Sequence, residues 1–182
     1  MKTQGGSPQA IPQLIVRGRS AGSQAGTLHF GGLRLPCALG RSGRRAAKRE
    51  GDGATPIGSF AVREVFYRAD RLARPRTALP LRPIAVLDGW CDDPLDRNYN
   101  RRVRHPYPAS AERLWRSDCL YDLVVVLGYN DRPRIAGRGS AIFMHVAGPG
   151  FAPTAGCIAL RLRDLKRLLE EVPRGAVVTV TA

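Results

Sequence analysis

The 182-residue sequence lacks several features that would assign it to a familiar class of protein. It has no apolar run approaching the roughly 20 residues that span a bilayer, so we expect no membrane span. Near its start, the longest apolar stretch is Leu14-Ile15-Val16, whereas a secretory signal needs about 7–15 apolar residues. We therefore expect a cytoplasmic protein. A truncated or misassigned start would instead fit export to the periplasm.

The cysteines lack the close spacing of a zinc site. Cys37, Cys91, Cys119 and Cys157 lie far apart in the chain, and no two of them form a metal knuckle. We therefore expect no metal and no cofactor. If one of the four is a catalytic thiol, one of the remaining three must stay unpaired, which favours a reducing compartment.

Acidic residues and lysine are both scarce. The chain has 29 Lys and Arg against 15 Asp and Glu, which gives a formal net charge of +14. Its only lysines are Lys2, Lys48 and Lys166. The arginines are spread along the whole chain rather than gathered in a stripe, and no nucleic-acid-binding motif is recognisable. An excess of positive charge suits carboxylate-rich ligands as well as nucleic acid, so a nucleic-acid-binding module stays a distant alternative.

Short apolar segments separated by turn residues predict a mainly β fold, a sandwich or barrel with one or two short helices. We expect residues 1–13 to form a flexible tail and 14–182 to form a single domain. The expected strands cover residues 14–17, 27–30, 33–35, 59–66, 122–128, 140–146 and 176–181. Short helices are expected at 110–116 and, after a capping Asp164, at 165–171.

Residues 67–121 have the character of an irregular insertion that covers part of the domain. Prolines interrupt the segment repeatedly, and long irregular stretches inside a compact domain are usually functional or disordered. Its aromatic, amide and guanidinium groups favour an ordered cover. We take Trp90, Asn98, Tyr99 and Arg101 as candidates for substrate binding, although Trp90 would serve equally well to anchor the insertion.

The stretch SAIFMHVAGPGFAPTAGCIAL, residues 140–160, carries the chemistry. In a strand, alternate residues share a face, so Phe143 and His145 point away from the aliphatic side. A Gly/Pro-rich loop then leads to Gly156 and Cys157. An imidazole activates a thiol either as a preformed thiolate–imidazolium pair or by taking the proton during attack. The alternative is a buried structural His and an inert buried Cys.

This segment resembles the signature of the L,D-transpeptidase (YkuD-type) catalytic domain family. His145 and the run Thr154-Ala155-Gly156-Cys157-Ile158-Ala159-Leu160 occupy the family's His and Ser/Thr-x-Gly-Cys-Ile/Val-Arg-Met/Leu positions. Thr55-Pro56-Ile57-Gly58-Ser59-Phe60 is similar to its Thr-Pro-x-Gly-x-Phe element, and residues 164–180 resemble its ending. The resemblance departs at Ala159, where the family usually has Arg. Because the family's Arg is absent at this position, we expect Arg161, or an Arg of the insertion, to hold the substrate carboxylates instead.

The resemblance also implies a cysteine acyltransferase that acts on peptidoglycan stem peptides or muropeptides. Cys157 would attack, His145 would act as base and then as acid, and backbone N–H groups at Gly156 and Ile158 would bind the oxyanion. A nearby carbonyl or hydroxyl would orient His145, with Thr154 as the candidate, although this threonine would equally suit a role in capping the loop. Hydrolysis by an L,D-carboxypeptidase is the expected outcome, with cross-linking by an exported enzyme as the alternative. A noncatalytic cell-wall-binding domain is disfavoured, because it would need neither His145 nor Cys157.

Overall fold

The computed structural model describes residues 11–182. Most of the expected tail, residues 1–10, lies outside the described residues, and Gln13 already begins a strand. No helix in the described part of the chain is both long and apolar enough to cross a membrane. All four cysteines are free thiols, three of them buried and Cys119 exposed.

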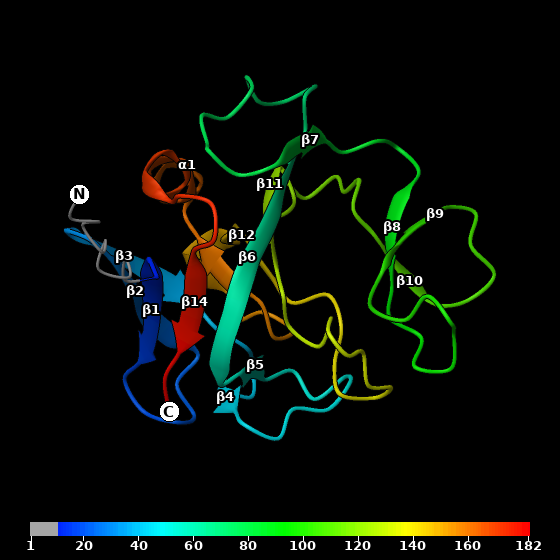
Figure 1. The fold of residues 1–182 in the computed structure, drawn as a ribbon, viewed down its shortest axis with the longest axis horizontal. Helices are drawn as coiled ribbons and strands as arrows, with labels where there is room; N and C mark the ends of the chain where they lie inside the picture. Colours follow the sequence, from blue (N-terminus) through cyan, green and yellow to red (C-terminus); the bar gives the residue numbers. More distant parts are fainter. Residues whose placement is uncertain (1–10) are drawn as a thin grey trace, which may run out of the picture.

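The fold is mainly β, as the sequence predicted, with a single α-helix in the described residues (Figure 1). The strands are β1 (Gln13–Gly18), β2 (Ala25–Phe30), β3 (Leu33–Ala38), β4 (Arg44–Arg45), β5 (Thr55–Pro56), β6 (Gly58–Tyr67), β7 (Leu81–Pro83), β8 (Asp88–Cys91), β9 (Arg102–Arg104), β10 (Ala111–Arg113), β11 (Leu123–Leu127), β12 (Phe143–Val146), β13 (Ile158–Leu160) and β14 (Val177–Val180). The helix is α1 (Leu162–Glu171), and a 3₁₀ turn spans Pro149–Phe151.

The main sheet closes on itself as a barrel. Its strand order is β11-β12-β13-β3-β2-β1-β14-β6-β7, and β6 also pairs with β11. Closure removes the exposed sheet edges that would otherwise invite pairing with other chains. The expected hairpin forms between β2 and β3, where Gly31 adopts the positive φ of 53° that its tight turn requires.

The helix α1 covers one side of the barrel with an apolar face. Leu165, Leu168 and Leu169 are buried in the same core as the aliphatic residues of the barrel strands. The helix begins three residues earlier than expected, with Arg161 as its N-cap. Asp164 therefore lies in the first turn, where a carboxylate still interacts favourably with the helix dipole, and not at the cap.

The insertion forms a small second sheet, with the order β10-β8-β9, beside the barrel (Figure 1). The helix expected at 110–116 is wrong: Ala111–Arg113 forms β10, which pairs with β8 through Glu112 and Trp90. A three-residue strand has too little periodicity to be recognised in the sequence. Its conformation is determined by its pairing with β8, which lies about 20 residues earlier in the chain.

Candidate active site

Two adjacent strands bring His145 and Cys157 to one face of the barrel sheet. Strands β12 and β13 are parallel, with His145 opposite Ala159, and Cys157 lies two residues before Ala159. Residues two apart along a strand share a face. Met144 and Ile158 point to the opposite face, into the aliphatic core, whereas Phe143 and Cys157 pack in a second, aromatic-rich cluster. The predicted alternation along residues 143–146 is confirmed.

His145 and Cys157 both line a cavity of about 520 Å³, a size that suits a peptide-like ligand. The barrel contributes one wall of this cavity, and the insertion contributes another through Glu112, Arg116 and Tyr121. Both members of the sequence-predicted pair therefore line the same cavity. The insertion covers that place, as expected from its ordered character, but it does so with other residues than those predicted.

Two threonines hold the backbone of Cys157. The Thr154 hydroxyl donates to the Cys157 carbonyl at 2.7 Å, and the Thr55 hydroxyl donates to the same carbonyl at 3.3 Å. The Thr55 hydroxyl also accepts from the Gly40 N–H at 2.8 Å. The two short motifs of the sequence thus meet at the nucleophile candidate. A carbonyl bound by two hydroxyls fixes the direction of the Cys157 peptide.

The glycine before Cys157 is required by close packing and backbone conformation. Gly156 has φ of 137°, a region that L side chains rarely adopt, and a Cβ there would lie 2.8 Å from the Ala54 carbonyl oxygen. The Gly156 N–H, predicted to bind the oxyanion, donates instead to the Thr154 hydroxyl at 3.1 Å. Ile158, the other predicted donor, lies in β13, whose backbone pairs with β12.

His145 is oriented by a carbonyl rather than by Thr154. Its Nδ1 lies 2.8 Å from the Val146 carbonyl oxygen, which only accepts, so Nδ1 carries the proton and Nε2 keeps a free lone pair. The prediction for Thr154 is therefore corrected, since its hydroxyl serves the Cys157 loop. The ring of Tyr121 meets the imidazole edge-on, with centroids 5.3 Å apart, and restricts its rotation.

The Cys157 thiol and the His145 imidazole are both uncharged at rest. Burial raises the pKa of the Cys157 thiol to about 12, with Glu112 adding to the rise, and burial lowers the pKa of His145 to about 4. The thiol donates to the Ala141 carbonyl at 3.3 Å, and its sulfur accepts from the Phe143 N–H at 3.4 Å. The arrangement therefore favours proton transfer during attack over a preformed thiolate–imidazolium pair.

The predicted substrate-binding residues lie elsewhere. The Trp90 indole is buried and donates to Asn100, so it anchors the insertion. Asn98 donates to the Tyr107 hydroxyl, and Arg101 is exposed outside the cavity. The hydroxyl of buried Tyr99 donates to Glu50, which does line the cavity, so Tyr99 acts from behind the wall. No signal in the sequence distinguishes these residues from those that line the cavity.

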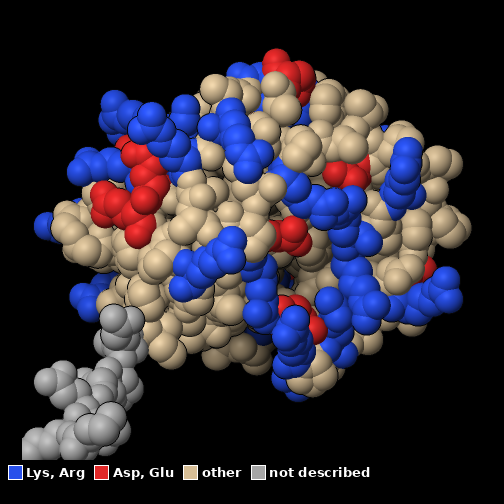
Figure 2. Space-filling model, turned by 45° about the horizontal axis from the view of Figure 1, so that its top comes forward, with Lys and Arg blue, Asp and Glu red and all other residues tan. Residues whose placement is uncertain are grey.

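The cationic residues of the cavity are Arg41 and Arg116. Arg116 belongs to the insertion, which was one of the two expected sources of a cationic residue. Arg161, the other expected source, is exposed and lies over the ring of Phe151 at 5.1 Å. Ala159 is fully buried between His145 and β3, so this position offers no group that could bind a carboxylate. Basic side chains are otherwise scattered over the surface, as Figure 2 shows for one face.

A family model describes the same region. The model of the L,D-transpeptidase catalytic domain (YkuD) matches residues 28–180. No curated protein matches the chain. The chain therefore belongs to the L,D-transpeptidase catalytic domain family.

Three solved structures with similarity to the chain come from mycobacteria. L,D-transpeptidase 1 of Mycobacterium tuberculosis is 14% identical, with a TM-score of 0.40, and the match covers 94% of this chain and 63% of that one. An L,D-transpeptidase of Mycobacterium smegmatis is 16% identical, with a TM-score of 0.44 and coverages of 94% and 59%. L,D-transpeptidase 3 of M. tuberculosis is 14% identical, with a TM-score of 0.45 and coverages of 94% and 62%. The chain thus spans about three fifths of the length of these proteins.

Proposed function

We propose that this protein is a cysteine acyltransferase that removes the terminal D-Ala from peptidoglycan stem tetrapeptides. The observation that carries the proposal is the position of Cys157 and His145 on one face of the barrel, in a cavity that also holds Arg41 and Arg116. A guanidinium binds a carboxylate through two parallel hydrogen bonds, and stem peptides carry several carboxylates. Membership of the L,D-transpeptidase family supports a peptidoglycan substrate.

The first half-reaction forms a thioester. As the Cys157 thiol attacks the carbonyl carbon of the third residue, His145 Nε2 takes its proton, the C–S bond forms and the negative charge develops on the carbonyl oxygen. We assign the Cys157 N–H, which belongs to the same residue as the attacking thiol, as a donor to this oxygen. The C–N bond to D-Ala then breaks, and the imidazolium returns the proton to the leaving amine.

The second half-reaction decides the product, and hydrolysis is our first assignment. The donor peptide would occupy the cavity that Cys157 and His145 line, so departure of D-Ala would free space for water beside the thioester. His145 would take a proton from this water as its oxygen forms a bond to the thioester carbon. The C–S bond would then break, and the imidazolium would return the proton to the Cys157 sulfur, which leaves a tripeptide carboxylate as product.

A specific feature of the cavity favours cross-linking as the second candidate. Glu50, Asp92 and Glu112 also line the cavity. Carboxylates attract an ammonium group, and an amine acceptor would replace water at the thioester to give a peptide cross-link. Both outcomes use the same nucleophile and base, so they differ only in the acceptor.

Mass analysis of products tests the proposal. The protein is incubated with purified disaccharide-tetrapeptide, and tripeptide plus free D-Ala is the expected result. Abundant dimer, or exchange with an added D-amino acid that outpaces hydrolysis, would assign the cross-linking function instead. No consumption of the tetrapeptide by the folded protein would overturn the peptidoglycan substrate.

A further inference from the structure

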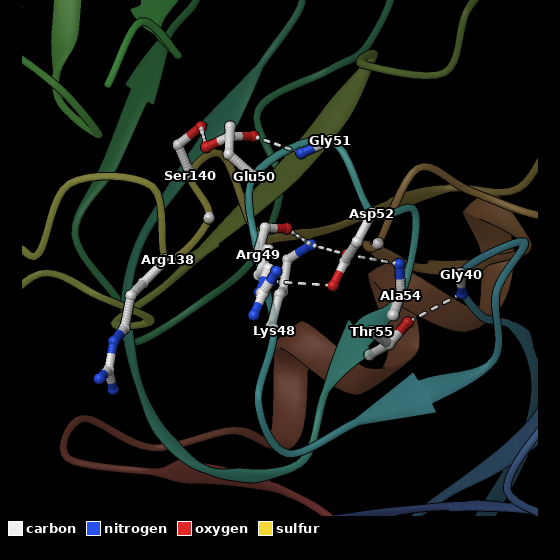
Figure 3. A network of polar contacts seen from close by, with 12 residues as sticks. Gly40, Lys48, Arg49, Glu50, Gly51, Asp52, Ala54, Thr55, Arg138 and Ser140 are labelled. Carbon is white, nitrogen blue, oxygen red and sulfur yellow. Dashed lines mark hydrogen bonds and ion pairs between the residues drawn. The ribbon is translucent and has the colours of Figure 1, made fainter. Parts of the chain in front are cut away.

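Figure 3 shows a buried ion pair between Lys48 and Asp52 in the loop that precedes β5. Lys48 Nζ lies 2.7 Å from Asp52 Oδ1, and the two side chains are only 3% and 9% exposed. The Asp52 carboxylate also accepts from the N–H groups of Arg49 and Ala54, both at 2.9 Å. It therefore holds the 48–54 loop in a compact turn with the ammonium inside it.

The lysine side chain contacts both segments that flank Cys157. A Cβ placed on Gly139 would lie 2.9 Å from Lys48 Cε, and one placed on Gly156 would lie 3.4 Å from Lys48 Nζ. Gly156 precedes the nucleophile, and Gly139 leads to Ala141, whose carbonyl accepts from the Cys157 thiol. The space between Gly139 and Gly156 is therefore filled by the Lys48 side chain, and a larger residue at either glycine would clash with it.

Stability alone gives little reason for a charge at this place. Replacing a buried ion pair by apolar residues of similar volume is often neutral or stabilising, because desolvation offsets the attraction between the charges. The chain otherwise uses arginine for 26 of its 29 basic residues, yet this buried position is one of its three lysines. Lysine differs from arginine as a compact point charge, which suits a narrow space beside a reacting group.

The groups that face Cys157 explain what the charge does. Glu112 of β10 disfavours a negative sulfur, Tyr121 and His145 are neutral neighbours, and Lys48 is the buried cation that lowers the pKa of the Cys157 thiol against the larger effect of burial. A fixed cation in a water-poor environment is worth far more than one in solvent.

We propose that Lys48, held by Asp52, is a positioning residue that braces the Gly156–Cys157 peptide and favours the negative charge that develops at Cys157 during attack. The proposal rests on Cys157 being the nucleophile, as in the proposed function. Lys48 itself does not line the cavity, so it acts through the backbone and through its field rather than by touching substrate.

Alkylation of Cys157 tests the proposal without any peptidoglycan substrate. All variants carry Cys119→Ser, which removes the exposed thiol, and the rate constant for iodoacetamide at Cys157 is followed by peptide mass analysis from pH 7 to 10. Lys48→Met keeps the length of the side chain and removes its charge. Asp52→Asn keeps the ammonium and removes the opposing charge. Lys48→Arg, which keeps the charge but not the size, is the third variant.

The two charge changes should act in opposite directions. We expect Lys48→Met to slow alkylation about tenfold and to lower kcat for D-Ala release by at least as much, with KM within twofold. Asp52→Asn should speed alkylation, because it leaves the ammonium uncompensated. Lys48→Arg should keep alkylation closer to wild type than Lys48→Met does.

If the Lys48–Asp52 pair only stabilised the loop, the result would be different. Loosening the loop would change alkylation in the same direction for Lys48→Met and Asp52→Asn, and this outcome, or unchanged rates in both, overturns the proposal. If Lys48→Met fails to fold by circular dichroism, slower or unchanged alkylation of Asp52→Asn overturns it. Charge-dependent alkylation in a protein that leaves tetrapeptide intact would retain this inference and reject the proposed function.

Discussion

At the scale of single residues, the site is an uncharged His–Cys pair held by a backbone carbonyl and two threonine hydroxyls. The Val146 carbonyl fixes the tautomer of His145, and two hydroxyls fix the Cys157 peptide. The sequence motifs identified Cys157 and His145 as candidates, because a short loop between a strand His and a Gly-Cys step is a recognisable pattern. They gave no signal for Lys48 or Tyr121, whose places depend on packing between distant segments.

The neutral pair predicts an unusual pH dependence of activity. Because the pKa of His145 is lowered to about 4, the imidazole stays an effective base well below the pH at which an exposed histidine would be protonated. We expect kcat/KM for D-Ala release to be flat from about pH 6 to 9 and to fall only as the pH approaches the lowered pKa. An acid limb centred near 6.5 would contradict the buried neutral imidazole.

Substitution of the cysteines separates the nucleophile from the other thiols. Cys157→Ser should lower D-Ala release by at least roughly 10³-fold with the fold intact, because the hydroxyl is a far weaker nucleophile near neutral pH. Cys119→Ser, which changes an exposed thiol, is the matched control and should keep wild-type activity. Cys37→Ala and Cys91→Ala should also retain activity. Wild-type turnover by Cys157→Ser would disprove the assignment.

The buried imidazole also predicts acid sensitivity of the fold. In the unfolded chain the histidine takes up a proton near pH 6.5, whereas in the folded state its pKa is about 4, so stability is full above pH 6.5 and falls as the pH drops toward 4. This difference amounts to about 3 kcal/mol of unfolding free energy. Urea titrations at pH 7, 5.5 and 4.5 should show a smaller loss for His145→Gln than for wild type. Equal losses of unfolding free energy in wild type and His145→Gln would contradict a lowered pKa of His145 in the folded state.

At the scale of elements, most barrel strands were predictable, whereas the short strands β7 and β13 and the sheet of the insertion were not. The apolar run 122–128 and the hairpin around Gly31 have clear patterns and form β11 and the β2–β3 pair. Strand β10 has three residues and is stabilised by pairing with β8. The cavity wall formed by the insertion therefore depends on the pairing of β10 with β8, which the β-propensity of the local sequence does not predict.

The insertion wall gives a prediction for substrate binding. Arg116 lines the cavity with Cys157 while its guanidinium pairs with Asp118, and its loss would remove a positive charge that attracts a substrate carboxylate. We expect Arg116→Ala to raise KM for tetrapeptide about tenfold, with a smaller change in kcat. Arg161→Ala, which removes an exposed guanidinium outside the cavity, is the matched control and should leave KM unchanged. Equal effects of the two would deny Arg116 a specific role.

At the scale of the whole molecule, the net charge of +14 acts on every anionic partner. Several arginines are engaged in ion pairs, for example Arg63 with Asp131 at 2.7 Å and Arg71 with Asp122 at 2.8 Å. On the face in Figure 2, the basic side chains are scattered and interrupted by acidic ones rather than gathered in a stripe. This distribution suits general attraction of anionic peptides better than recognition of a nucleic-acid backbone.

General attraction predicts that salt slows the enzyme by reducing capture of substrate. A positive molecule draws an anionic peptide toward its cavity over distances of about 10 Å at 0.1 M salt, and added ions screen this field. We expect kcat/KM for tetrapeptide to fall several-fold between about 50 and 500 mM NaCl, with kcat nearly constant. A tetrapeptide whose carboxylates are amidated is the control and should show a much weaker dependence. Equal salt dependence of the two substrates would assign the effect to the protein's conformation instead of its charge.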